Sequence, residues 1–152
     1  MSVNLDVQFR LYLRNREQAD AAKLALDDFF EHELEGEVKT YCRENNKSSN
    51  CPWIVFGLSY DSIIISRGWL WAPRIEEDFR ARVAAVAPDV PDFLVWFDVY
   101  DVDDERLNPT ISSKLRRSLL AWLPKSDRSY FRGPAGACYR MLWQSLRSRF
   151  ET

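Results

Sequence analysis

Alternating apolar and polar side chains mark the beginning of the chain as a β-strand. Apolar residues occupy every second position from Val3 to Leu13. The positions between them carry Asn4, Asp6, Gln8, Arg10 and Tyr12. A period of two is the repeat of a strand, in which successive side chains point to opposite faces. We therefore expect a strand over residues 3–13 with one buried face and one face in water.

The period changes to that of a helix directly after this strand. Asn15 is suited to cap a helix N-terminus, and Gln18 follows at the capping-box spacing. The helical repeat is carried by Ala22, Leu26, Phe29 and Phe30. Gly36 is suited to end the helix. The pattern predicts a helix that runs to about Leu34.

Four later segments also have strand character. Residues 37–43, 53–60 and 63–71 are rich in β-forming side chains, and the last two are spaced as a hairpin. Trp69 and Trp71 would then share one strand face. Residues 93–102, rich in aromatic and β-branched side chains, predict a final strand.

Proline and helical spacing predict three further helices. Pro73 suits the first turn of a helix, because its missing N–H would be unpaired there, and Pro88 closes that helix. Apolar residues at helical spacing over 111–122 and 139–150 predict two C-terminal helices.

The order β-α-β-β-β-α-β, followed by two helices, predicts an α+β fold. We expect an antiparallel-containing sheet with two helices on one face, in an order that resembles the ferredoxin-like split βαβ arrangement over residues 3–103. A chain of 152 residues is the size of one domain, so residues 1–152 are expected to fold together.

Charge divides this domain into two parts. Residues 1–105 hold 21 acidic and 11 basic side chains, a net charge of −10, whereas residues 106–152 hold 2 acidic and 10 basic ones, a net charge of +8. Either the two parts face and neutralise each other, or they form separate binding surfaces. The segregation also permits self-association, and it leaves the oligomeric state open.

The sequence predicts a cytoplasmic protein with no membrane segment and no cofactor. It has no apolar run of membrane-spanning length and no signal-peptide pattern at its start. Its three cysteines lack zinc-site spacing, so no metal is expected and the thiols should be reduced. Whether Cys42 and Cys51 ever pair stays open.

No catalytic constellation is visible, and the prediction is therefore a protein that is not an enzyme. His32 is the only histidine, and it lies between two glutamates near the end of a predicted helix, where a solvated position is expected. Asp98 and Asp101 are the only acids placed for acid–base work.

The densest acidic group lies at the end of the last predicted strand and is the leading candidate for a partner-binding surface. It comprises Asp98, Asp101, Asp103, Asp104 and Glu105, and its four aspartates are the candidate contact residues. Trp69 and Trp71 would add aromatic anchors if they are exposed, since tryptophan dominates binding hot spots.

These features favour a non-enzymatic protein-binding module. Bacterial immunity proteins, which neutralise a cognate toxin, are one group of this general character, and an acidic surface would steer and pair with a basic toxin. The alternative is a nucleic-acid-binding or regulatory protein that uses the basic C-terminal helices. Its candidate surface consists of Lys114, Arg117, Arg140 and Arg147.

Overall fold

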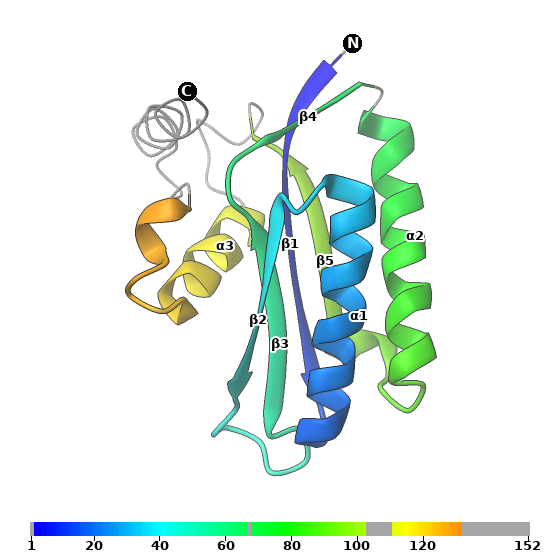
Figure 1. Ribbon diagram of the computed structural model, residues 1–152, viewed down its shortest axis with the longest axis vertical. Coiled ribbons are helices and arrows are strands. Elements are labelled where there is room, and N and C mark those ends of the chain that lie inside the picture. The colour runs from blue at the N-terminus through cyan, green and yellow to red at the C-terminus, as the bar shows by residue number, and fades with distance from the viewer. Residues whose placement is uncertain (1, 67, 103–110, 132–152) are drawn as a thin grey trace.

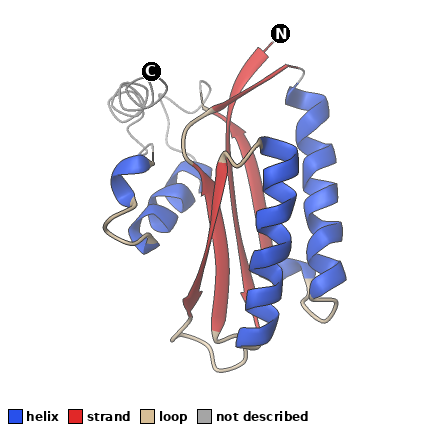
Figure 2. Cartoon of the chain, in the orientation of Figure 1, coloured by secondary structure: helices blue, strands red, loops and turns tan. Residues whose placement is uncertain are grey.

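A computed structural model describes residues 2–66, 68–102 and 111–131, and it shows an antiparallel sheet with helices on both faces (Figures 1 and 2). The main elements are β1 (Ser2–Leu13), α1 (Arg16–Leu34), β2 (Val38–Glu44), β3 (Trp53–Ser59), β4 (Ile63–Ser66), α2 (Gly68–Val86), β5 (Val95–Asp101) and α3 (Ile111–Trp122). Two short 3₁₀ helices, η1 (Asp92–Leu94) and η2 (Arg128–Tyr130), complete the described part. Helices α1 and α2 lie side by side on one face, and α3 lies on the other.

Strand β1 is the centre of the sheet and pairs with three others, all antiparallel. β3 pairs with residues Gln8–Leu13 of β1, and β5 pairs with Leu5–Leu11. Because these stretches overlap, β3 and β5 must bond to opposite edges of β1. β2 pairs with β3. The predicted α+β class with an antiparallel sheet is therefore confirmed, while the ferredoxin-like order stays a prediction.

The start of α1 follows the predicted capping pattern. The Asn15 Oδ1 atom accepts a hydrogen bond from the Gln18 backbone N–H at 2.8 Å, and Gln18 Oε1 accepts one from the Arg14 N–H. At the other end, Glu35 adopts a left-handed backbone with φ of 52°, and Gly36 follows at 76°. The predicted helix bounds are thus confirmed at both ends.

The strand predicted over 63–71 is wrong in its second half. β4 ends at Ser66, and α2 begins at Gly68, so Pro73 lies inside the helix and not at its first position. Trp69 and Trp71 therefore lie on a helix and not on a strand. The side chain of Trp71 packs partly buried against the core. Aromatic residues are enriched in strands, but tertiary packing can override this preference.

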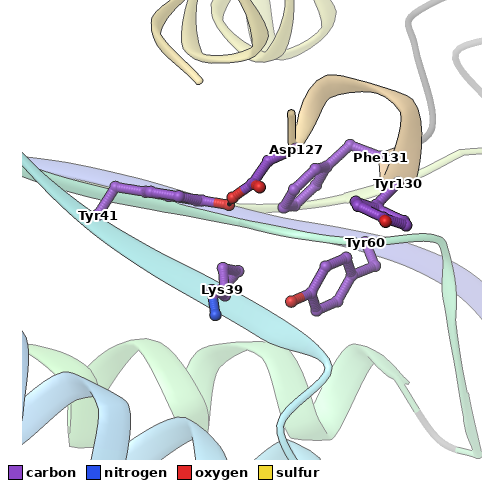
Figure 3. Close-up of a pocket in the computed structure, with 6 residues that line it drawn as sticks. All are labelled: Lys39, Tyr41, Tyr60, Asp127, Tyr130 and Phe131. Carbon is purple, nitrogen blue, oxygen red and sulfur yellow. Dashed lines mark hydrogen bonds between the residues drawn. The ribbon is translucent and has the colours of Figure 1, made fainter. Parts of the chain in front are cut away.

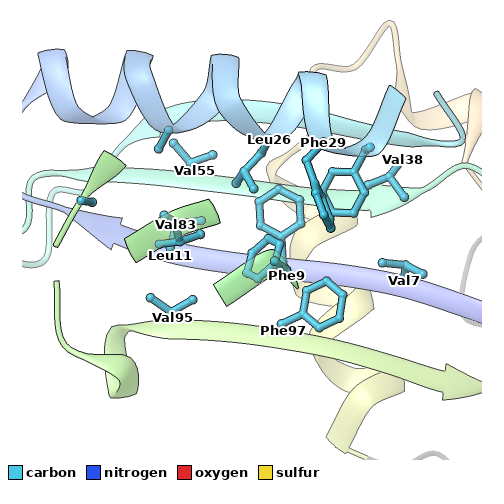
Figure 4. Packing of buried hydrophobic residues seen from close by; sticks show 14 of the residues in the cluster. Val7, Phe9, Leu11, Leu26, Phe29, Val38, Val55, Val83, Val95 and Phe97 are labelled. Atoms are coloured by element: carbon cyan, nitrogen blue, oxygen red, sulfur yellow. The ribbon is translucent and has the colours of Figure 1, made fainter. Parts of the chain in front are cut away.

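The main core lies between the sheet and the helices α1 and α2, and Phe9 is at its centre (Figure 4). Its ring stacks on Phe30 with centroids 5.4 Å apart and contacts Phe79 at 5.2 Å. The cross-strand partner of Phe9 is Gly57, where an added Cβ would lie 2.3 Å from the Phe9 ring. Only glycine leaves room for the ring at this position.

The second face of β1 is covered, contrary to the sequence expectation of a face in water. Asp6 and Gln8 are fully buried there. A second core cluster forms on this side, where Leu119 of α3 and Phe131 pack against Phe56 of β3. Alternation showed that the two faces differ, but it carried no information about a covering helix more than a hundred residues later.

The C-terminal helix expected over residues 139–150 lies outside the described residues. The helix expected over 111–122 is confirmed as α3. The single-domain prediction for residues 1–152 stays a prediction.

Replacing Phe9 by alanine should lower the free energy of unfolding by about 3–5 kcal/mol, because a fully buried ring would leave a cavity. Leu24→Ala is the control, since Leu24 is 73% exposed on α1 and its loss should change stability by about 0.5 kcal/mol or less. Urea denaturation of both variants measures the difference. Similar losses in the two would contradict this description of the core.

Candidate functional site

An open pocket of about 300 Å³ lies on the second face of the sheet, beside the segment that follows α3 (Figure 3). Its lining residues are Lys39, Tyr41, Tyr60, Asp127, Tyr130 and Phe131. Four of the six are aromatic. The volume is at the lower end of the range for small ligand sites, so it suits one side chain or a small molecule.

Three separate segments of the chain place these residues. Lys39 and Tyr41 are two positions apart on β2 and therefore share a face. Tyr60 directly follows β3, and its backbone N–H donates to the carbonyl of Glu37 at 3.1 Å. The remaining lining residues come from η2 and its flanks. The sheet thus supplies one side of the pocket and the turn after α3 supplies the other.

The aromatic rings form two walls at an angle. Tyr60 and Phe131 stack with centroids 4.7 Å apart and planes inclined by 20°. Tyr41 lies with its centroid 6.4 Å from Phe131 and its plane tilted by 56°. Tyr41 is itself stacked on Phe56 at 5.4 Å, which fixes its orientation. Tyr130 is 45% exposed and belongs to the rim.

Burial and nearby carboxylates both raise the pKa values of the two inner tyrosines, and burial has the larger effect. The Tyr41 hydroxyl donates to Asp127 Oδ2 at 2.7 Å, and the two groups meet in Figure 3. Burial raises the pKa of Tyr41 far above its ordinary value, and the hydrogen bond to Asp127 raises it further. Burial likewise raises the pKa of Tyr60, with smaller effects from the charges of Asp127 and Glu37. Both phenols are therefore protonated at neutral pH.

A buried ionic group lies beside the pocket and fastens α3 to the sheet. Arg116 is fully buried, with Nε 3.6 Å from Asp6 Oδ2, and it donates from its second terminal nitrogen to the Ser59 carbonyl at 2.8 Å. Asp6 Oδ2 also accepts from the Tyr100 hydroxyl at 3.0 Å. Burial lowers the pKa of Arg116 to about 10. Arg116 of α3 thereby contacts β1 and β3, and the Tyr100 hydroxyl extends the group to β5 through Asp6.

The predicted acidic surface is only partly described. Asp98 is half-buried on β5, and its Oδ2 accepts from Gln8 Nε2 at 3.2 Å, so the fold itself uses this carboxylate. Asp101 lies at the end of β5, opposite Leu5. Asp103 and Asp104 lie outside the described residues. The partner-binding role of these four residues stays a prediction.

The alternative basic surface is described for two of its four residues. Lys114 and Arg117 are both exposed on α3. Arg140 and Arg147 lie outside the described residues. Arg116, which counted among the basic C-terminal residues in the sequence, is instead buried.

The histidine and the described cysteines lie away from the pocket. The His32 side chain is 76% exposed on α1, where Nδ1 is 2.9 Å from the Asp28 carbonyl. Cys42 packs against the core on the α1 side, and burial raises the pKa of its thiol. In the described ranges, no group of three or more His, Cys, Asp or Glu residues could hold a metal ion.

None of the helices in the described part combines the length and apolar composition that a bilayer crossing requires. No protein-family model, no curated protein and no solved structure matches the chain. Any functional conclusion therefore rests on the geometry of the pocket and its surroundings.

Sequence reasoning missed this pocket, because its residues come from three segments without a shared motif. Tyr41 and Lys39 fit an ordinary strand, and Tyr60 fits the end of a hairpin strand. The one sequence signal for this side of the sheet was the row of polar residues on β1. Asp6 belongs to that row, and a carboxylate on a covered strand face requires a partner.

Arg116→Met should lower the free energy of unfolding by about 3–5 kcal/mol, because it leaves the Asp6 carboxylate buried without its cation. Arg117→Met is the matched control: the neighbouring side chain is exposed, and its loss should cost about 0.5 kcal/mol or less. Chemical denaturation of both variants provides the comparison. If the two variants were equally stable, Arg116 would not fasten α3 to the sheet.

The raised pKa of Tyr41 predicts a loss of stability at alkaline pH. The unfolded chain releases the phenol proton near its ordinary pKa of about 10, whereas the folded state retains it, so the free energy of unfolding falls as pH rises above about 10. Tyr41→Phe removes this contribution. The variant should therefore lose less stability than the wild type between pH 9 and pH 11, about one unit either side of that pKa, in urea denaturation at each pH. Parallel pH profiles would show that Tyr41 titrates normally.

Proposed function

We propose that this chain is a non-enzymatic protein-binding module whose tyrosine pocket receives part of a protein partner. The observation that supports this proposal is the open pocket itself, with four aromatic lining residues, three of which are fixed by ring contacts on a packed sheet face. Aromatic residues dominate the energetics of protein interfaces, and a concave pocket is where an anchoring side chain docks.

The chemistry of the lining supports binding over catalysis. Its two inner tyrosines have raised pKa values and are protonated at neutral pH, so neither serves as a base or a nucleophile. Neither histidine nor cysteine occurs among the described lining residues. The remaining groups, Asp127 and Lys39, are suited to recognition through charge.

The charge of the larger part of the chain favours a basic partner. Residues 1–105 carry a net charge of −10, which would accelerate association with a positively charged protein. A toxin inhibitor of the immunity-protein type is a partner-binding protein of this kind, and it is the specific form that we propose. The acidic residues Asp98, Asp101, Asp103 and Asp104 would make a second contact. Leu5 of β1 pairs with Asp101 of β5 on one edge and with Ile63 of β4 on the other. Asp101 and the start of β4, shortly after Tyr60, therefore lie at the same end of the sheet.

Tyr130→Ala should weaken partner binding by about 2 kcal/mol or more, roughly 30-fold, as expected for an aromatic anchor at an interface. Phe93→Ala is the control, because Phe93 is 84% exposed on η1 and takes no part in the pocket. Affinity capture with the wild-type chain as bait identifies the partner. Calorimetry then measures the affinity of that partner for the wild type and for each of the two variants.

A partner that binds wild type and both variants equally would refute docking at the pocket. A captured nucleic acid whose affinity falls steeply with salt, and falls further when Lys114 and Arg117 are replaced, would favour the alternative function.

A further inference from the structure

Two guanidinium groups share one indole ring on the second face of the sheet, beyond the part of β1 that is fully buried there. The Arg43 guanidinium lies 4.8 Å from the ring centroid of Trp122, and the Arg10 guanidinium lies 5.9 Å from it. Both distances are within the range of about 6 Å in which a cation is attracted to an aromatic face. Two positive charges are therefore concentrated at the C-terminus of α3.

The strand register brings these two arginines together. Arg10 of β1 is opposite Phe56 of β3. Arg43 of β2 is opposite Ile54, which lies two positions before Phe56 on β3. Side chains two positions apart on a strand share a face, so both arginines belong to the same sheet face, in adjacent rows. Trp122 lies over this place, since its ring contacts Phe56 with centroids 5.5 Å apart.

Three aromatic rings hold the Arg10 guanidinium in position. Besides Trp122, they are Tyr12 at 5.4 Å and Trp96 at 6.0 Å from ring centroid to guanidinium carbon. The Arg10 side chain is half-buried, and its Nε atom is buried without a hydrogen-bond partner. Its terminal nitrogens also lack a partner in the described part of the chain, and they are open to the solvent. A guanidinium fixed in this way loses little conformational entropy when it binds a ligand.

Neither arginine has a carboxylate partner among the described residues. Arg10 forms no hydrogen bond or ion pair with them, and Arg43 forms one hydrogen bond, from Nε to the Glu44 carbonyl at 3.3 Å. Asp98 is on the same sheet face, but its carboxylate accepts from Gln8 Nε2. Within the described ranges the pair therefore has no opposite charge, and an anionic group is the complementary ligand.

The charge of the rest of the molecule favours one kind of anion. A guanidinium binds carboxylate and phosphate oxygens with the same fork of N–H donors. A nucleic acid carries a phosphate at every nucleotide, and the net charge of −10 over residues 1–105 would repel it. A single carboxylate is affected much less, because it carries one charge and contacts the two cations directly.

The two arginines also adjoin the pocket that we propose as a protein-binding site. Tyr41 lines that pocket, and Arg43 lies two positions further along β2, so the two side chains share a face. A protein that places a side chain in the pocket therefore has its neighbouring residues close to Arg43.

From this arrangement we infer that Arg10 and Arg43 form a site for a carboxylate, and that its ligand is an aspartate or glutamate side chain of the partner protein. This inference rests on the proposed protein-binding function and deepens it by naming a group that is recognised. The carboxylate accepts from the terminal N–H groups of Arg10, and Arg43 adds attraction through its charge. A partner that is basic overall must then carry an acidic residue at this place, which restricts the proteins that can bind.

The test uses two small probes on the full chain: N-acetyl-glutamic acid α-methylamide and its neutral analogue N-acetyl-glutamine methylamide. Binding is followed by NMR through the Nε–H signal of Arg10 and the indole N–H signal of Trp122. We expect the glutamate probe to bind with a dissociation constant on the order of 10 mM and the glutamine probe to bind at least about fivefold more weakly.

Variants at both arginines show which groups bind the probe. Arg10→Gln should weaken the glutamate probe at least about fivefold, because it removes the fork of donors. Arg10→Lys keeps the charge without the fork and should weaken it about twofold to threefold. Arg43→Gln should have an effect of similar size, because it removes a nearby positive charge. If Arg10→Gln does not fold, the other two variants still test the site.

Arg82→Gln is the matched control. The Arg82 guanidinium also lies over a ring, that of Phe29 at 5.7 Å, but it already has the Asp28 carboxylate 3.2 Å away. It belongs to α2, on the opposite face of the sheet. Its replacement should leave the affinity of the glutamate probe unchanged.

Two results would overturn the inference. The first is equal binding of the two probes, or binding of the glutamate probe that the Arg10 and Arg43 variants leave unchanged. The second comes from a short single-stranded thymidine oligonucleotide, which we expect not to bind. If it binds with a steep salt dependence that Arg10→Gln and Arg43→Gln both reduce, the pair is a phosphate site for nucleic acid and not a site for a protein carboxylate.

The captured partner separates this inference from the proposed function. If Tyr130→Ala weakens the partner while Arg10→Gln and Arg43→Gln leave its affinity unchanged, the pocket binds a protein and the inference fails. If the probes bind as expected and no protein partner binds, the carboxylate site stands and the protein-binding function fails. Replacement of each interfacial aspartate and glutamate of the partner by its amide should identify one residue whose loss removes the effect of Arg10→Gln.

Discussion

The arrangement of the second sheet face depends on one buried cation. Transfer of the Arg116 guanidinium from water into the protein carries a large desolvation cost, which is offset only while its partners are in place. Those partners are the carboxylate of Asp6 on β1 and the carbonyl of Ser59 at the end of β3. Since each comes from a different element, any shift of α3 along the sheet would separate the charges. The pair therefore favours one position of the helix over others of similar apolar burial.

The position of α3 also determines the position of the pocket. η2 follows α3 closely, and the Arg128 guanidinium donates to the carbonyls of Leu123 and Ala121 near the C-terminus of the helix. The hydrogen bond between Tyr41 and Asp127 then connects this turn back to β2. A site held at both ends loses little conformational entropy when a ligand binds, so a small pocket can still discriminate between ligands.

Local sequence patterns predicted the elements whose formation depends on neighbouring residues. The capping pattern at Asn15 and the alternation along β1 correspond to elements found at those residues. The burial of Asp6 could not be predicted, because its cationic partner Arg116 lies on α3, far away in the chain. Trp71 was placed on a strand because its neighbourhood is rich in aromatic residues, and packing against the core decided otherwise. The pocket depends on three segments whose proximity no local pattern encodes.

Carboxylates of the same type have different uses in this fold according to their surroundings. Asp6 is fully buried and has a guanidinium beside it, so its charge serves the packing of α3. Asp127 lines an open pocket, where its Oδ2 atom accepts from the Tyr41 hydroxyl. Under the proposed function, the acidic surface would act over a longer range, because distant charges mainly change the rate of association, whereas contacts desolvated on binding mainly change the rate of dissociation. A partner would thus be attracted by the net charge and retained by the pocket, and the two effects depend on different residues.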